Sequence, residues 1–258
     1  MSERARTGLL ERGFAETAIL AGILLWWFTA QGVPEFVLPS PGAVALTMGR
    51  FFTDAGLAYH FAISAGRVIA AVSCAMLLSL ILAALASRSA IVTAILERRV
   101  LVFLNSFPSV GWAILGVMWF QVSTGTVIFI QMAIILPFCL ISAMSGFRQI
   151  DAELAEMGRS LSRSPVRRFL KVTLPLMTPI LMSGIRIAYG ICWKIALVAE
   201  LFGAQSGLGY LLVRAQSSAD ATMVFAVCLM IVVAVIVVDR LILNPLAQRY
   251  SVNKGVSQ

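Results

Sequence analysis

The stretch Ala58–Ala86 reads AYHFAISAGRVIAAVSCAMLLSLILAALA, and Arg67 is its only charged residue. A helix needs roughly 20 predominantly apolar residues to cross the hydrocarbon core of a bilayer, so this stretch is long enough to do so. Five other runs are similar, and together they predict an all-α polytopic membrane protein with about six transmembrane helices. The six runs are Phe14–Ala30, Ala58–Ala86, Leu101–Phe120, Thr126–Ser145, Leu176–Leu201 and Met223–Leu243.

The composition of the whole chain agrees with this interpretation. Of its 258 residues, 60% are hydrophobic and only 12% are charged, whereas a soluble domain is about 45–50% apolar and about 25% charged. These values exclude an ordinary cytosolic enzyme, a disordered protein and a coiled coil. The four cysteines all lie inside apolar runs, so we interpret them as small buried side chains and expect neither a disulfide framework nor a metal site.

The distribution of basic residues predicts the orientation in the membrane. Fourteen of the 20 lysines and arginines lie at the N-terminal end, in the loops Ser87–Val100 and Gly146–Pro175, or in the C-terminal tail. The opposite side holds only Arg50 and Arg214. Because cytoplasmic loops carry an excess of Lys and Arg, both termini are expected in the cytoplasm. Topology therefore explains the net charge of +8, and no nucleic-acid partner is expected.

Three regions follow from this arrangement. Residues 1–57 are expected to form an anchor helix and an external interfacial segment, in which Ser40-Pro41 begins a short helix. Residues 58–243 hold the other spans, and residues 244–258 form a cytoplasmic tail. Small residues at four-residue spacing in the second and fifth spans predict close helix packing. These are Ala62, Gly66, Ala70 and Cys74, and Gly184, Ala188, Cys192 and Ala196.

The loop before the fifth span is the most informative segment. Gln149–Pro175 reads QIDAELAEMGRSLSRSPVRRFLKVTLP. Asp151 can cap a first helix, and Ser164-Pro165 supplies an N-cap and a first-turn proline for a second one. The sequence therefore predicts a cytoplasmic helix, a turn and another helix, whose apolar side must be buried against the membrane surface or against another protein.

This loop resembles the EAA loop of bacterial ABC importer permeases, in which Glu-Ala-Ala is followed at fixed spacing by Gly, Ile and Leu-Pro. Glu156 takes the Glu position, Val172 takes the Ile position, and Leu174-Pro175 closes the pattern. Met157-Gly158 stands in place of Ala-Ala, and Ser162 in place of Gly.

The resemblance extends over most of the chain and is to the permeases of nitrate, sulfonate and taurine importers. The matching stretches run in order from about Leu38 to Asp239. They include Leu38-Pro39-Ser40-Pro41, Ser64-Ala65-Gly66-Arg67-Val68, Phe107-Pro108, Gly184-Ile185-Arg186, Ala199-Glu200 and Gly207-Leu208-Gly209-Tyr210.

The resemblance implies a type I ABC importer permease fold for residues 58–243 and a location in the bacterial inner membrane. It implies a pair of permease subunits, two cytoplasmic ATPase subunits that use ATP and Mg, and a periplasmic or lipid-anchored binding protein that delivers a small, sulfonate-, nitrate- or taurine-like solute. The permease itself would bind membrane lipid but no cofactor, and it would not be an enzyme. The residues that the resemblance assigns to ATPase coupling are Glu153, Glu156, Met157, Gly158, Leu161, Ser162 and Pro175.

Ionisable residues inside spans are costly and face a cavity or a partner. We therefore take Arg67, Arg186, Lys194 and Glu200 as candidate residues of a translocation pathway. For Arg67 and Arg186, structural pairing is the alternative. For Lys194, which has no counterpart in the resemblance, one hypothesis is that it attracts an anion together with Arg67. The alternative is a contact between Lys194 and Glu200 within one helix.

Two other classes of protein are considered. A membrane enzyme would need a constellation of catalytic or metal-binding side chains, whereas the chain has one histidine, His60, and no GxSxG turn. The chain also lacks a GxxxxGK[ST] phosphate-binding loop, so by that motif it does not supply its own ATPase. An ion-gradient-driven secondary transporter of a small solute is the alternative function, since buried charges also suit ion coupling.

Overall fold

The computed structural model describes residues 3–150 and 164–251, and within these ranges every regular element is helical. The chain divides into two compact units. One consists of residues 1–58 and 211–230, and the other of residues 59–210 and 231–258. The second unit contains the loop and span charges singled out above.

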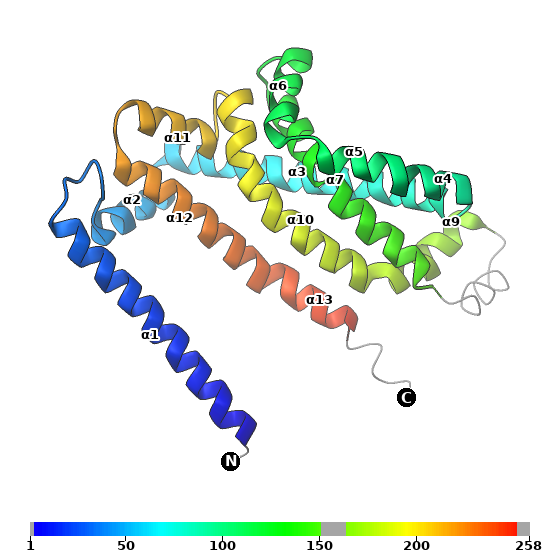
Figure 1. Cartoon of the computed structure of the whole chain (residues 1–258), viewed down its shortest axis with the longest axis horizontal. Helices are drawn as coiled ribbons and strands as arrows, with labels where there is room; N and C mark the ends of the chain where they lie inside the picture. Colours follow the sequence, from blue (N-terminus) through cyan, green and yellow to red (C-terminus); the bar gives the residue numbers. More distant parts are fainter. Residues whose placement is uncertain (1–2, 151–163, 252–258) are drawn as a thin grey trace. The chain divides into compact units, whose positions relative to one another are not determined.

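Figure 1 shows the described helices in chain order. The elements are α1 (Glu3–Gln31), α2 (Pro41–Thr53), α3 (Ala55–Ala86), α4 (Ala90–Ile95), η1 (Leu96–Val100), α5 (Leu101–Ser106), α6 (Ser109–Phe120), α7 (Thr124–Arg148), α9 (Pro165–Arg168), η2 (Phe169–Thr173), α10 (Leu174–Gly203), α11 (Leu208–Ser217), α12 (Ala221–Val238), η3 (Asp239–Leu243) and α13 (Asn244–Ser251). The η elements are π-helical turns that continue into the helices beside them.

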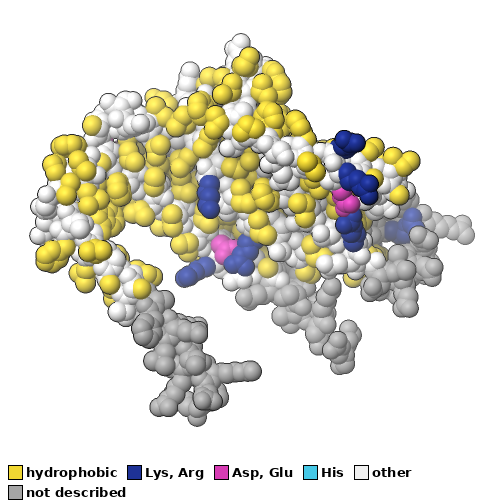
Figure 2. All heavy atoms as spheres, in the orientation of Figure 1, with side chains coloured by type: hydrophobic (Ala, Val, Ile, Leu, Met, Phe, Trp, Pro, Cys, Tyr) yellow, Lys and Arg dark blue, Asp and Glu magenta, His cyan; other side chains and the backbone are white. Residues whose placement is uncertain are grey.

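Three continuous helices are long and apolar enough to cross a membrane: Ala55–Ala86, Thr124–Arg148 and Ala221–Ala247. Two bent pairs of helices raise the number of candidate spans to five. Apolar side chains cover much of the face shown in Figure 2. The first expected span corresponds to α1. Its apolar part, Thr17–Gln31, is shorter than the helices counted as candidate spans. The described residues thus give an all-helical protein with three to five candidate spans, and the sixth stays a prediction.

The third expected span is not a single helix from Leu101 to Phe120. Helices Ala90–Ser106 and Ser109–Phe120 meet at an angle of 87° (Figure 1). Phe107 is extended at the break, as expected for a residue before proline, and Pro108 precedes the first turn of α6. The prediction of a loop over Ser87–Val100 was also wrong for most of this segment, because the chain is helical from Ala90 onward.

Two expected helix starts are confirmed. Ser40 Oγ accepts a hydrogen bond from the Ala43 amide at 3.3 Å, and α2 begins at Pro41. Ser164 Oγ accepts a bond from the Arg167 amide at 3.4 Å, and α9 begins at Pro165. In both places a serine satisfies an amide that the first helical turn leaves without a backbone partner.

The core of the second unit includes the tight packing of α10 against α7. All four small residues of the expected stripe on α10 are buried. A Cβ added to Gly184 would lie 2.4 Å from Ser142 Oγ, so only glycine allows this approach. The stripe on α3 behaves differently, because Ala62, Gly66 and Cys74 are exposed in the described chain. The packing prediction is therefore confirmed for α10 and not for α3.

Contacts of Trp26 connect separate segments of the first unit. Its indole Nε1 donates a hydrogen bond to the Pro39 carbonyl at 3.0 Å. Its ring stacks on Phe225 with ring centroids 5.9 Å apart. The end of α1, the turn before α2 and the start of α12 are therefore held around one aromatic side chain.

Candidate functional site

A buried polar cluster joins α3 to the end of α10, in the second unit. Its centre is an ion pair between Arg67 Nη1 and Glu200 Oε1, 2.9 Å apart. Arg67 is 3% exposed and Glu200 1% exposed. The hydroxyl of Ser64 lies 2.7 and 2.8 Å from the two carboxylate oxygens, and the Gly209 amide donates to Oε2 at 2.9 Å. We call Ser64, Arg67, Thr124, Glu200 and Ser206 the Arg67–Glu200 cluster.

The guanidinium of Arg67 holds three segments together. Nη1 also donates to the Ser206 carbonyl at 2.7 Å. Nη2 donates to Thr124 Oγ1 and to Ser206 Oγ, both at 3.0 Å. One arginine thus connects α3 with the first residue of α7, the carboxylate on α10 and the loop that follows α10.

The turn after α10 is built around the Glu200 carboxylate. Gly207 has φ +111°, and a Cβ added to it would lie 2.4 Å from carboxylate atoms of Glu200. A Cβ at Gly209 would lie 2.6 Å from Glu200 Cβ. Both glycines are therefore required by space, and Gly207 also by its backbone conformation. The Gly207 amide donates to His60 Nδ1 at 2.9 Å, and the His60 ring stacks on Tyr210.

The arrangement of the cluster favours a structural role. A buried ion pair is stable only where further hydrogen bonds compensate for the lost hydration, and removal of one partner leaves a costly unpaired charge. Both carboxylate oxygens of Glu200 already have partners, and both terminal nitrogens of Arg67 are used. The pathway role predicted for Arg67 and Glu200 therefore has little support from the geometry, which corresponds to the pairing alternative.

The other two charged candidates lie on more exposed parts of α10. Arg186 makes a two-pronged contact with Asp239 of η3, in which Nη2 lies 2.6 Å from Oδ2. Lys194 is exposed, and it makes no ion pair with any residue that the structure describes. The expected alternative contact between Lys194 and Glu200 is wrong, because Glu200 pairs with Arg67 instead.

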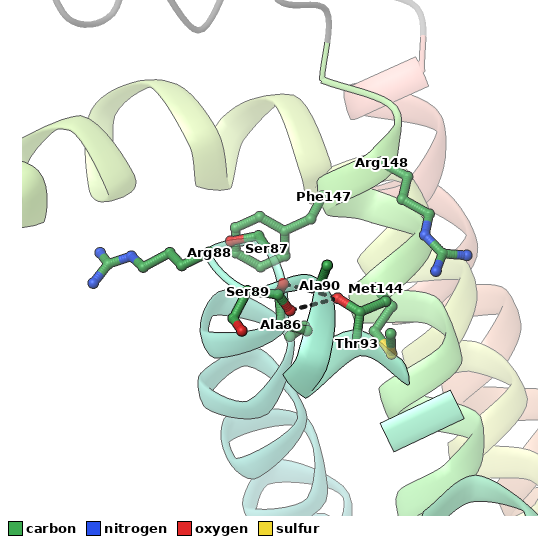
Figure 3. A pocket seen from close by; sticks show the side chains of 10 residues that line it. Ala86, Ser87, Arg88, Ser89, Ala90, Thr93, Met144, Phe147 and Arg148 are labelled. Carbon is green, nitrogen blue, oxygen red and sulfur yellow. Dashed lines mark hydrogen bonds between the residues drawn. The ribbon is translucent and has the colours of Figure 1, made fainter. Parts of the chain in front are cut away.

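A cavity of about 440 Å³ lies at the far end of α3, where α4 and α7 meet it. The Thr93 hydroxyl in its wall donates to backbone carbonyls of Ala86 and Ser89. Arg88 and Arg148 extend away from the pocket on opposite sides (Figure 3). Their guanidinium groups therefore do not converge on a ligand, and we do not assign a solute site here.

The predicted coupling residues fall almost entirely outside the described part of the chain. Glu153, Glu156, Met157, Gly158, Leu161 and Ser162 all lie within residues 151–163. Pro175 is described, and it is exposed in the first turn of α10. The coupling role of all seven residues stays a prediction.

Reasoning from the sequence missed most members of the Arg67–Glu200 cluster. Ser64, Thr124 and Ser206 were not candidates, although each donates or accepts a bond inside it. A usable signal was present in three separate stretches that resembled the same permeases, namely those around Arg67, Glu200 and Gly207. The structure brings these stretches together in one cluster.

The comparison of the sequence with protein families decides the class. The family described as "Binding-protein-dependent transport system inner membrane component" matches residues 83–245, more than half of the chain. The chain belongs to this family. The matched range contains α10 with Lys194 and Glu200 and the whole predicted coupling loop, while Arg67 lies before it.

Relatives extend the similarity to the N-terminal side. A protein of Haemophilus influenzae described as an ABC transporter permease is 30% identical over 219 residues, which cover 83% of this chain and 88% of the relative. A Bacillus subtilis protein named for aliphatic sulfonate transport is 28% identical, over 86% of this chain and 82% of the relative. The taurine transport system permease of Escherichia coli is 29% identical, over 73% of this chain and 71% of the relative.

The chain is therefore an ABC transporter permease, a multi-pass component of the inner membrane and not itself a catalytic ATPase. Its family description implies an ATPase and a binding protein as partners. The resemblance to ABC importer permeases, drawn from the EAA-like loop and the other stretches, is thus confirmed at the level of the family.

Proposed function

We propose that this permease forms the translocation pathway of an importer for a small anionic solute of the sulfonate, nitrate or taurine type. The observation that carries the proposal is the family match over residues 83–245. Relatives named for aliphatic sulfonate and taurine transport support the solute class. The full assembly would contain two copies of the permease, two ATPase subunits and a periplasmic or lipid-anchored binding protein.

The proposed topology has six spans, with both termini in the cytoplasm. The candidate spans and α1 support the number, and the excess of basic residues at the ends and in two loops supports the orientation. In this arrangement residues 1–57 form the anchor and an external interfacial helix. Residues 58–243 form the permease domain, and residues 244–258 form the cytoplasmic tail.

The proposed coupling segment docks on the ATPase and transmits its closure to α10. Its support is the spacing from Glu156 to Leu174-Pro175, which matches the EAA pattern in full. The end of the segment continues through α9 and η2 into α10 without a break. A displacement of the segment would therefore act directly on the helix that carries Lys194 and Glu200.

The coupling proposal can be tested in proteoliposomes that hold the permease, its ATPase and its binding protein. Glu156→Arg should reduce ATP hydrolysis stimulated by the loaded binding protein at least tenfold, while the amount of permease in the membrane stays unchanged. Glu35→Gln is the matched control, because Glu35 is exposed and lies outside the loop. Stimulated hydrolysis that is equal in Glu156→Arg and in the control would overturn the coupling role.

A further inference from the structure

Among the residues that the structure describes, one cation stands out because it lies well inside an expected span and has no acidic partner. Four basic residues lie in or at the ends of the expected spans. Arg67 is paired with Glu200 and Arg186 with Asp239. Arg240 has no ion-pair partner among the described residues, but it lies near the end of its expected span, where its side chain can reach the membrane surface. Lys194 lies nine residues inside the end of α10, about 14 Å along its axis, and has no acidic partner among the described residues.

Lys194 stands on a distinct face of α10. Ser183, Ile187, Lys194 and Leu201 are exposed and fall within a narrow angular range on the helix. On the opposite face Cys192, Ala196 and Ala199 are buried. Gly190 lies one turn from Lys194, and a Cβ added there would meet nothing within 4 Å, so this part of the face is open.

Lipid is an unfavourable neighbour for this face. A lysine at the centre of a spanning helix costs about 2.5–3.5 kcal/mol on insertion scales, and one about 14 Å inside its end costs part of this unless it reaches water or a counter-charge. Glu200 offers no counter-charge, since six residues separate it from Lys194 and turn it by roughly 120° around the axis, toward α3. A water-filled pathway that carries an anion would satisfy the ammonium.

We propose that Lys194 is the residue that selects for an anion in the translocation pathway. The inference rests on the proposed function and deepens it, because it names the group on this chain that recognises the solute. The ammonium offers three N–H donors and a single charge. It therefore suits a compact group such as a sulfonate or a nitrate. Arg67, which is neutralised inside its cluster, adds no free charge to the pathway.

The first test uses the assembled wild-type transporter and a water-soluble amine-acetylating reagent. The chain has three lysines, Lys171, Lys194 and Lys254, so the modified sites can be separated by mass spectrometry. Acetylation of Lys194 should occur and should fall at least fivefold in the presence of ethanesulfonate or nitrate, but not with an uncharged sulfone. Lys171 is the internal control, whose acetylation should not change. An unmodified Lys194, or one that neither anion protects, would overturn the proposal.

The second test measures uptake with charge variants in the same preparation. Lys194→Met should lower ATP-driven uptake of ethanesulfonate or taurine at least tenfold, and Lys194→Arg should restore most of it. Arg214→Met is the control, because Arg214 is an exposed cation on α11. Equal ATP-driven uptake in Lys194→Met and wild type would refute the role of Lys194 alone. A complete absence of ATP dependence in wild type would instead refute the proposed function.

Discussion

The pair of Arg67 and Glu200 illustrates how two opposite charges can be held in an apolar environment. Each charged group has several partners, so its lost hydration is replaced by fixed donors and acceptors. Ser64 lies between the carboxylate and the Leu208 amide, which donates to its hydroxyl at 2.8 Å. The loop after α10 is therefore attached to α3 through side chains that are separated by more than 130 residues in the sequence.

Breaking this pair should destabilise the permease strongly. Arg67→Met leaves the Glu200 carboxylate buried and unpaired, and the free energy of unfolding should fall by about 3–5 kcal/mol. Glu200→Gln should have an effect of similar sign. In the double variant, the loss in the free energy of unfolding should be clearly smaller than the sum of the losses in the two single variants. Denaturant-induced unfolding of the purified permeases measures all three values.

The control for this cycle is Arg214→Met, whose exposed side chain should change the free energy of unfolding by less than about 0.5 kcal/mol. Strictly additive losses in the double variant would show that the two residues are not coupled.

At the scale of single residues, the sequence could predict that Arg67 would be paired but not with which residue. The partner depends on how α3 packs beside α10, which no local pattern encodes. The contact between Lys194 and Glu200, which the structure does not contain, is a case in which local geometry could be judged from the sequence. Helical geometry alone was sufficient to make it unfavourable, since side chains six residues apart do not face each other.

Close packing of α7 and α10 is the main interaction between elements in the second unit. Gly184 of α10 lies against Ser142 of α7, and Gly146 of α7 lies against the flexible side chain of Met177. The two contacts are similar in distance but differ in what can move. A serine side chain in a helix has few alternatives, whereas the end of a methionine adapts readily.

Gly184→Ala should therefore be more destabilising than Gly146→Ala. Overpacking at Gly184 should lower the free energy of unfolding by about 1–3 kcal/mol, while the change at Gly146 should cost less because the Met177 methyl can move. Thermal unfolding followed by tryptophan fluorescence measures both. The added change Ser142→Gly should recover part of the loss at Gly184, and equal effects at the two glycines would contradict this account of the packing.

At the scale of elements, long apolar runs predicted the positions of α3, α7, α10 and α12 well. The region from Ala90 to Phe120 was predicted less well. Glu97, Arg98 and Arg99 interrupt the apolar run, so the sequence indicated a loop where the helix continues. A proline at position 108 is consistent with a break there, but the size of the bend depends on packing around Phe107, whose ring lies against Gly111 and Trp112.

The predicted orientation of the whole molecule in the membrane rests on its charges alone. The positive-inside rule predicts that both termini lie in the cytoplasm, because the ends and two of the expected loops carry most of the basic residues. This argument uses no contact in the structure, so it can be tested separately from the fold.

A fluorescent protein that matures only in the cytoplasm should fluoresce when it is fused after Gln258. The reciprocal fusion to alkaline phosphatase, which is active only outside the cytoplasm, should be inactive at the same position. Insertion of the phosphatase next to Asp54, in the segment expected outside, should give activity. The opposite pattern of fluorescence and phosphatase activity would reverse the orientation and remove the coupling loop from the side of the ATPase.

The central claim is that this chain moves its solute only when a separate ATPase drives it. The most direct measurement is solute uptake by proteoliposomes that contain the permease alone, or the permease with its ATPase and binding protein. We predict uptake that requires all three components and ATP hydrolysis, and no uptake by the permease alone in an imposed proton or sodium gradient. Gradient-driven uptake by the permease alone, with no gain from the ATPase and ATP, would contradict the account and identify a secondary transporter.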